Sequence, residues 1–266
     1  MFDSIAGDYD ALNHILSLDV DKIWRKKALK QIVDAPAPAR VLDLACGTGD
    51  FSIAIAKALS RSHKRVGTPI EAHVKAPAKA PVEAQVTSTG FVTGDSGRPD
   101  LMTKGHVTGV DLSEGMLAVM REKVAKAGLT EMISIEEGDG ENLRFPDNTF
   151  DRVTIAFGIR NFENREKGLR EMLRVLKPGG RLVILELSRP ENKVIRWFYD
   201  LYFLHILPKI GGKVSGDKAA YAYLPASVAA FPGKKEFSAT MRKAGFRTVT
   251  HKAFTLGICR MYTGEK

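Results

Sequence analysis

Two short apolar segments, each ending in a turn, constrain the fold of this chain more than any other feature. Residues 40–45 lead into a Gly-Thr-Gly turn at 47–49, and a later apolar segment ends at Asp111, after which Ser113 favours a helix start. Glycines at a strand-to-helix turn remove the Cβ atoms that would keep a ligand away from the backbone. A carboxylate at the end of the neighbouring strand can accept hydrogen bonds from ribose hydroxyls. The pair is therefore typical of an α/β sheet that binds a nucleoside.

A later block makes this interpretation more specific. Residues 173–184, LRVLKPGGRLVI, predict a helix that stops at Pro-Gly-Gly and an apolar strand that follows. The glycine turn lacks the third glycine of the dinucleotide fingerprint, because Ser52 stands in its place. Together these features resemble the class I S-adenosylmethionine (SAM) dependent methyltransferases. A nicotinamide dinucleotide oxidoreductase stays open as an alternative from a different class.

Length and composition fit a globular protein in a reducing compartment. The 266 residues, 44% of them hydrophobic, can bury a sizeable core. Cys46 and Cys259 are the only cysteines, so neither a disulfide framework nor a metal site is expected. The start has no secretory pattern and no apolar stretch is long enough to span a bilayer, so the expected location is cytoplasmic. Lysines and arginines are scattered, and the net charge of +9 therefore indicates a solvated basic surface rather than a nucleic-acid site.

The periodicity of apolar residues predicts alternating strands and helices along one domain, residues 1–266. Such alternation favours a Rossmann-like, doubly wound α/β sheet, mostly parallel and covered by helices on both faces. Two final strands joined by a short turn predict an antiparallel C-terminal hairpin. The predicted helices are 12–33, 50–59, 113–128 and 165–176, and the predicted strands are 40–45, a strand ending at 111, 132–137, 150–157, 181–187, 246–254 and 257–263.

Three segments stand apart from this alternation. Residues 1–35 are expected to form a helical segment on the substrate side. Residues 60–105 hold four prolines and one aromatic residue, so they are expected to be an insertion, either a surface hairpin or a mobile loop, without a catalytic role. Residues 190–235 are expected to form a helical lid, because residues 194–207 are rich in aromatics but too short to span a bilayer. A buried core helix is the alternative for that stretch.

Residues at the ends of the predicted strands match the parts of SAM. Asp43 suits the methionine ammonium group, Asp111 suits the ribose, and Asp139 suits the adenine amino group. Cys46 is expected to fill space rather than to act as a nucleophile. The candidate SAM-binding residues are Asp43, Gly47, Thr48, Gly49, Asp111, Asp139, Gly140 and Ala156.

The end of the predicted strand 150–157 indicates the class of methyl acceptor. Residues 156–161, AFGIRN, lack the acidic or amide residue followed by two prolines and an aromatic that enzymes acting on the amino groups of bases commonly carry. The acceptor is therefore expected to be a carbon or an oxygen of a small molecule, and no nucleic acid is expected as a partner.

The same string carries a more specific resemblance. With residues 2–6 (FDSIA), 9–13 (YDALN), Trp24 and 221–227 (YAYLPAS), it is similar to the ubiquinone/menaquinone biosynthesis C-methyltransferases of the UbiE/MenG type. The resemblance covers nearly the whole chain outside the insertion. It implies methylation of a ring carbon of a polyprenylated hydroquinone, either demethylmenaquinol to menaquinol or, in some organisms, the methoxy-benzoquinol precursor of ubiquinone.

This chain departs from the family pattern at three positions. A serine that usually precedes Phe-Gly is Ala156 here, and loss of one neutral hydrogen bond costs about 1 kcal/mol. Asp19 and Asp21 stand where the family often shows glycine and histidine, so no role for that histidine transfers. The family's other SAM contacts fall on Thr48, Asp111, Asp139 and Gly140.

The implied chemistry needs a stabilised phenolate, because a free phenol has a pKa of about 10 and is mostly neutral at pH 7. We expect Arg160 and Asn161 to hold the phenolate oxygen and either water or His14 to receive the proton. The candidate catalytic residues are Arg160, Asn161 and Tyr9, and the candidate substrate contacts are Asn13, Phe157 and Tyr223.

Several alternatives stay open at this stage. Another small-molecule SAM methyltransferase, acting on a sterol, an acyl lipid or a phenol oxygen, would share the cofactor motifs. A non-enzymatic SAM-binding protein would explain the departures at residues 19, 21 and 156. A peripheral contact with the inner face of the membrane and a homodimer are also open.

Overall fold

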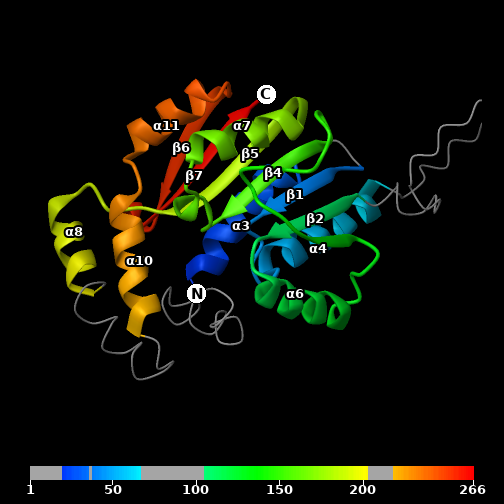
Figure 1. Ribbon diagram of the computed structural model, residues 1–266, viewed down its shortest axis with the longest axis horizontal. Coiled ribbons are helices and arrows are strands. Elements are labelled where there is room, and N and C mark those ends of the chain that lie inside the picture. The colour runs from blue at the N-terminus through cyan, green and yellow to red at the C-terminus, as the bar shows by residue number, and fades with distance from the viewer. Residues whose placement is uncertain (1–19, 36–37, 67–104, 203–217) are drawn as a thin grey trace, which may run out of the picture.

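The computed structural model describes residues 20–35, 38–66, 105–202 and 218–266. Its core is a seven-stranded sheet in the order β3-β2-β1-β4-β5-β7-β6 (Figure 1). The first five strands run parallel, and β7 pairs antiparallel with β5 and β6, so the expected mixed sheet with a C-terminal hairpin is confirmed. The strands are β1 (Arg40–Leu44), β2 (His106–Asp111), β3 (Ile133–Glu137), β4 (Phe150–Ala156), β5 (Leu176–Leu187), β6 (Arg247–Phe254) and β7 (Cys259–Glu265).

Helices cover both faces of the sheet because successive strand side chains point to opposite sides. In β1, Val41 packs in the core cluster that includes α3, α4 and α6, whereas Leu42 packs in the cluster that includes α7 and α11. The described helices are α3 (Val20–Ile32), α4 (Asp50–Val66), α6 (Glu114–Lys126), α7 (Arg165–Val175), α8 (Lys193–Asp200), α10 (Lys218–Ala230) and α11 (Lys234–Lys243), with 3-10 turns η1 (Ile159–Asn161) and η3 (Thr255–Gly257).

Local capping signals decide where α6 lies. The Ser113 hydroxyl accepts a hydrogen bond from the Met116 N–H at 3.2 Å, which confirms Ser113 as the N-cap. Gly128 follows the helix with a φ of +65°, a conformation in which glycine ends helices without strain. The sequence signals at both ends of this helix therefore correspond to real backbone features.

Several predicted boundaries differ from the structure, and the final strand is Cys259–Glu265 rather than 257–263. Helix α4 runs to Val66 rather than to residue 59, so residues 60–66 belong to the helix and not to the insertion. Helix α7 ends at Val175, and β5 already begins at Leu176, which pairs with Phe150. The register then shifts before Arg181, so Pro178 lies in an irregular part of the strand where its missing N–H disturbs no regular ladder.

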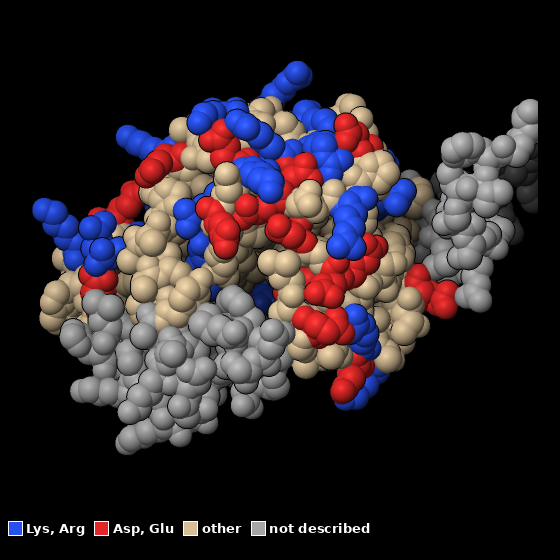
Figure 2. All heavy atoms as spheres, viewed as in Figure 1, with Lys and Arg blue, Asp and Glu red and all other residues tan. Residues whose placement is uncertain are grey.

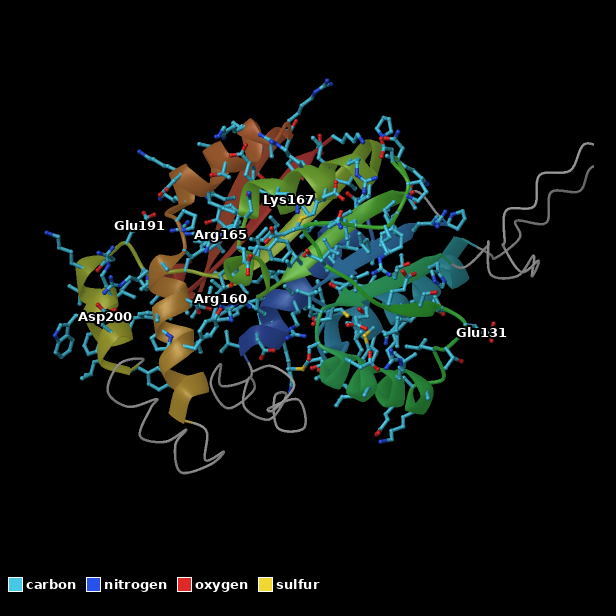
Figure 3. The ribbon with its side chains drawn as sticks, in the orientation of Figure 1. Glu131, Arg160, Arg165, Lys167, Glu191 and Asp200 are labelled. Carbon is cyan, nitrogen blue, oxygen red and sulfur yellow. The ribbon has the colours of Figure 1, made fainter. Side chains whose placement is uncertain are left out.

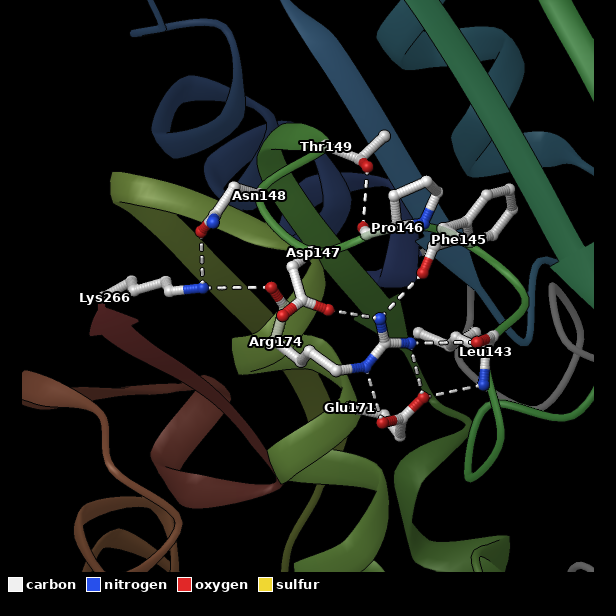
Figure 4. A network of polar contacts seen from close by, with 9 residues as sticks. All are labelled: Leu143, Phe145, Pro146, Asp147, Asn148, Thr149, Glu171, Arg174 and Lys266. Carbon is white, nitrogen blue, oxygen red and sulfur yellow. Dashed lines mark hydrogen bonds and ion pairs between the residues drawn. The ribbon is translucent and has the colours of Figure 1, made fainter.

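The connection between β3 and β4 is held by a polar network centred on Arg174 of α7 (Figure 4). Its guanidinium donates to the carbonyl oxygens of Leu143 at 2.9 Å and Phe145 at 2.8 Å. It also pairs with Asp147 and Glu171, each at 2.8 Å, and these carboxylates raise the pKa of Arg174 above its ordinary value. The loop that leaves the end of β3 is therefore fixed to the helix beneath it.

The segments outside the sheet are described in part. Of the N-terminal segment 1–35, residues 20–35 are described and include α3, while the central part of the insertion, residues 67–104, lies outside the described residues. Segment 190–235 contributes α8, α10 and the beginning of α11, with residues 203–217 outside the description. No helix in the described ranges is both long and apolar enough to cross a membrane.

Candidate functional site

The ends of β1, β2, β3 and β4 surround a cavity of about 320 Å³ at the carboxyl edge of the sheet. This is the edge at which open α/β sheets bind their ligands, and the volume lies at the lower end for small-molecule sites. Seven of the sequence-predicted residues line it: Gly47, Asp111, Asp139, Gly140, Ala156, Phe157 and Asn161.

The cavity wall is acidic. Asp111, Asp139, Glu141 and Glu163 line it, and no lysine or arginine stands among its described lining residues. Figure 2 shows a hollow on this face of the molecule with acidic side chains beside it. Such a wall attracts a cationic ligand and repels the pyrophosphate of a dinucleotide. This charge pattern argues against the dinucleotide alternative.

The glycine turn and Asp111 form one structural unit. Asp111 Oδ2 accepts a hydrogen bond from the Gly47 N–H at 2.8 Å, and Oδ1 accepts one from the Ser113 N–H at 2.9 Å. Gly47 has a φ of +56°, which glycine adopts readily. The carboxylate is thus tied to the turns after both β1 and β2. Because a carboxylate oxygen can accept more than one hydrogen bond, these contacts are compatible with a ligand hydroxyl at the same group.

Other residues of the turn, Gly49 and Thr48, pack beneath the cavity. A Cβ on Gly49 would lie 2.4 Å from Met120 Cγ, so this glycine permits close packing of α4 against α6. Thr48 is buried, and its hydroxyl accepts a hydrogen bond from the Lys123 ammonium at 3.3 Å. Neither residue lines the cavity. Cys46 Sγ lies 3.5 Å from Met120 Sδ, and burial raises the pKa of its thiol, which agrees with a space-filling role.

Asp43 is buried beneath the turn rather than exposed in the cavity. Its Oδ2 accepts a hydrogen bond from the Ser52 hydroxyl at 2.6 Å. Burial raises the pKa of Asp43 to about 7, against the opposing effect of the Ser52 hydrogen bond. Asp43 is therefore not among the residues that line the cavity, whereas the sequence suggested that it contacts the ammonium group directly or through water.

The side of the cavity assigned to adenine contains residues that the sequence reasoning missed. Leu112 lines it and is 68% exposed, and the largely buried Met116 also contributes to the lining. An apolar residue directly after the strand-end carboxylate was the available signal. A Cβ on Gly140 would lie 2.6 Å from Phe162 Cζ, so only glycine fits there without displacing the ring.

The end of β4 carries a strained aromatic residue on the cavity wall. Phe157 has a φ of +64°, which is uncommon for a residue with a side chain and is often found at functional sites. Its ring centroid lies 6.2 Å from that of Trp24 and 5.6 Å from the Arg25 guanidinium, both on α3. Helix α3 therefore holds this ring in place.

Arg160 lies in a buried ion pair. Its guanidinium contacts Glu186 Oε1 at 2.8 Å, and its backbone N–H donates to Glu186 Oε2 at 3.1 Å. The guanidinium also donates to the Phe157 carbonyl oxygen and to the Ser227 hydroxyl of α10, the latter at 3.3 Å. Figure 3 shows Arg160 next to α10. The structure thus joins Arg160 to the strand end and to α10, and does not bring its charge to the cavity wall.

Glu186 was missed by sequence reasoning, although it is a charged residue inside an apolar strand. It is fully buried at the end of β5. A buried carboxylate needs a paired cation or several hydrogen bonds, and Arg160 supplies the cation while the Leu187 N–H donates at 2.8 Å. An isolated charge in such a strand is therefore a usable signal for a buried partner.

The structure brings Asn161 together with Tyr223, which the sequence had suggested as a substrate contact. Asn161 lines the cavity, and its Oδ1 accepts a hydrogen bond from the Tyr223 hydroxyl of α10 at 2.9 Å. This contact directs the amide oxygen of Asn161 toward α10. Tyr9, Asn13 and His14 lie outside the described residues.

Solved structures of methyltransferases share this fold. A SAM dependent methyltransferase from Aquifex aeolicus aligns with a TM-score of 0.54 at 20% identity, covering 90% of this chain and 88% of that chain. A putative S-adenosyl-L-methionine-dependent methyltransferase from Methanococcus maripaludis aligns with a TM-score of 0.59 at 16% identity, covering 100% and 94%. At this identity the likeness establishes the class I methyltransferase fold.

Sequence relatives are closer. The ubiquinone/menaquinone biosynthesis C-methyltransferase UbiE of Geobacter sulfurreducens is 44% identical over 266 residues, which is 100% of this chain and 87% of that protein. The demethylmenaquinone methyltransferase of Bacteroides fragilis is 39% identical and is covered to 91%. The family model matches residues 1–266. The chain therefore belongs to the ubiE/COQ5 methyltransferase family.

Proposed function

We propose that this protein transfers a methyl group from SAM to a ring carbon of a polyprenylated hydroquinone, with demethylmenaquinol as the acceptor. Membership in the ubiE/COQ5 family and the names of relatives at about 40% identity support this assignment. The structural observation that carries it is the acidic cavity at the carboxyl edge of the sheet, because SAM is a cation at its sulfonium and ammonium groups.

The residues around the cavity fit SAM. Asp111 offers carboxylate oxygens to the ribose hydroxyls, and the backbone at Gly47 is open to close approach. Exposed Leu112 offers an apolar surface to the adenine ring, and the wall beside Gly140 has no room for a side chain. When bound, SAM supplies an electrophilic methyl group. Asp43 and Thr48 support the turn from beneath in this proposal, so their effect on SAM is indirect.

On the acceptor side, Asn161 is the described residue best placed to contact the hydroquinone oxygen. Its Oδ1 accepts from Tyr223, so its amide N–H groups are available to donate to a phenolate. Each pKa unit of phenolate stabilisation corresponds to about 1.36 kcal/mol. Arg160 is a positioning residue in this proposal, since its charge is balanced by Glu186 and its contacts hold η1 against α10. Tyr9 and Asn13 are assigned to the ring pocket by family resemblance alone.

The substrate's prenyl tail implies a location at the membrane surface. A long isoprenoid chain partitions into lipid because of its apolar area. We infer that the protein works as a peripheral protein at the inner face of the cytoplasmic membrane, where such a substrate is available.

A labelling experiment tests the proposed reaction. The protein is incubated with methyl-labelled SAM and demethylmenaquinol, and the product is analysed by mass spectrometry with fragmentation. We expect the label on a ring carbon. Label on an oxygen, or SAM binding without transfer to any quinol, would refute the proposal. Titration with NADH as a control should show no binding, given the acidic wall.

A further inference from the structure

Helix α8 presents an unusual apolar face to solvent. Val194 is 65% exposed, Trp197 61%, Phe198 59% and Leu201, at the end of the helix, 39%. Large apolar side chains exposed together, rather than singly, mark an interaction surface. Figure 1 shows α8 at one end of the molecule, away from the central sheet.

The spacing of these residues puts them on one side of the helix. Positions 194, 197, 198 and 201 are related by three, four and seven residues, which in an α-helix fall on a single face. Tyr199 points the opposite way and is only 7% exposed, so it anchors the helix to the body of the protein. The exposed face is therefore outward and continuous, and the Trp197 and Phe198 rings pack edge to face at 4.9 Å.

Polar contacts hold this face in position. The Asn192 side chain caps the helix by accepting from the Val194 and Ile195 N–H groups at 2.9 and 3.2 Å. At the other end Asp200 pairs with Arg189 at 2.7 Å. A tethered and capped helix with its apolar side outward is typical of a preformed docking element rather than of a frayed end.

The charge next to the face favours an anionic partner. Lys193 is exposed in the first turn of α8, about a quarter of a turn from the apolar face, whereas Arg196 lies on the side of the helix that carries Tyr199. Among the described residues neither has a carboxylate partner, whereas the Arg196 guanidinium donates to the Pro190 carbonyl oxygen at 2.8 Å. An exposed lysine without a carboxylate partner beside an apolar helix face matches the headgroups and acyl boundary of an anionic bilayer.

We propose that α8 lies in the surface of an anionic lipid bilayer, with its apolar face inserted among the headgroups. The helix is about 12 Å long, far too short to cross the bilayer. Its four apolar side chains offer on the order of 400 Å², about half of the ~800 Å² per partner that a stable dimer buries, so a lipid surface is the better occupant than a second copy. This inference rests on the proposed function, because the membrane is the source of a prenylated substrate.

Docking through α8 would also bring the acceptor side of the cavity close to the membrane surface. Tyr223 and Ser227 of α10 contact Asn161 and Arg160 at the acceptor side of the cavity. Figure 1 draws α8 next to α10, so a membrane that holds α8 lies on the acceptor side of the molecule in this proposal. The prenylated substrate can then reach the cavity without crossing bulk water.

Vesicle binding of the full chain tests the inference. The protein is sedimented with vesicles of equimolar phosphatidylglycerol and phosphatidylcholine, and with pure phosphatidylcholine as the uncharged comparison. The variant Trp197→Ser/Phe198→Ser removes the centre of the face, and Leu256→Asn, at a 72% exposed apolar position elsewhere, is the matched control. We expect the double variant to bind the anionic vesicles at least tenfold more weakly and the control to bind like the parent.

A fluorescence measurement gives a second readout. The chain has two tryptophans, and Trp24 is buried, so a blue shift on adding vesicles reports on Trp197. Methyl transfer to a short-tailed, water-soluble hydroquinone should be equal in all variants, which separates failure of docking from failure of the proposed function. Unchanged vesicle binding by the double variant, or no blue shift in the parent, would overturn the inference. The inference would also be overturned if the parent formed a dimer and did not bind vesicles, and if the double variant were a monomer.

Discussion

Asp111 shows how one side chain can serve structure and ligand together. Each of its oxygens accepts a backbone N–H, from Gly47 and from Ser113, and so fixes two turns at the cavity edge. A hydrogen bond to a charged group contributes about 1.5–3 kcal/mol. The residue predicted from its position alone is therefore also a structural element of the site.

Replacing Asp111 by Asn should weaken both roles. The amide NH₂ cannot accept, so one of the two backbone donors loses its partner and one ribose acceptor is lost. We expect SAM affinity to fall at least tenfold in calorimetry. Glu137→Gln, an exposed carboxylate on the neighbouring strand, is the control and should bind SAM like the parent. Equal affinity of the Asp111→Asn variant and the parent would contradict the assigned site.

Substitutions in the Arg160–Glu186 ion pair should change the stability of the protein and its methyl transfer activity independently. Glu186→Leu leaves a buried guanidinium without its carboxylate and should cost about 3–5 kcal/mol in urea unfolding. The double variant Arg160→Met/Glu186→Leu removes both charges and should recover most of that stability. Its methyl transfer should stay at least tenfold below the parent with SAM affinity unchanged, because η1 and Asn161 lose their support from α10. Full activity in the double variant would show that the pair serves the fold alone.

The buried carboxyl of Asp43 predicts a dependence of stability on pH. Its pKa is about 7 in the folded protein against 3.8 ordinarily, chiefly because of burial. Between these values the folded state keeps a proton that the unfolded chain releases, so its contribution to the free energy of unfolding falls as pH rises and levels off above pH 7. The size of this change is roughly 4 kcal/mol. Urea unfolding of the parent and of Asp43→Asn across this range should diverge accordingly, and a constant difference between them would disprove the raised pKa.

At the scale of elements, caps and bulges decide boundaries that apolar periodicity leaves open. Ser113 caps α6 as its position suggested, whereas the Pro-Gly-Gly block lies inside β5. Helix α7 ends before the Pro-Gly-Gly block because Leu176 pairs with Phe150 of β4. A shift in register then accommodates Pro178 within β5. Proline and glycine mark an interruption in a pattern, but the pairing partner determines which element contains them.

The N-cap of α6 offers a direct test at this scale. Ser113→Ala removes the hydroxyl that accepts from the Met116 N–H and should cost about 1 kcal/mol, or roughly 2–4 °C in thermal midpoint for a chain of this size. Thr130→Ala, at an exposed position just beyond the same helix, should leave the midpoint unchanged. Equal midpoints for the Ser113→Ala variant and the parent would show that the cap is dispensable.

At the scale of the whole molecule, the sheet and its helices are joined across the insertion. Ile55 and Leu59 of α4 pack in the same core cluster as Val107 of β2, and the His106 N–H donates to the Ala39 carbonyl oxygen at 2.9 Å. Replacing residues 67–104 by a flexible glycine-serine linker should therefore preserve cooperative unfolding and SAM affinity. Loss of methyl transfer in that variant would assign the insertion a catalytic role.

The sequence by itself determined the sheet class, the glycine turn, Asp111 and the strand ends that meet at the cavity. These are local features, because strand periodicity, turn chemistry and the end of a parallel strand are all readable within a few residues. Only the tertiary structure decided that Asp43 and Thr48 lie beneath the turn, that Arg160 faces Glu186, and that α8 turns its apolar side outward. The Arg160 ion pair depends on Glu186, which is 26 residues away in the sequence. The other outcomes depend on which face of each helix is covered, and burial and charge pairing are set only when distant elements pack.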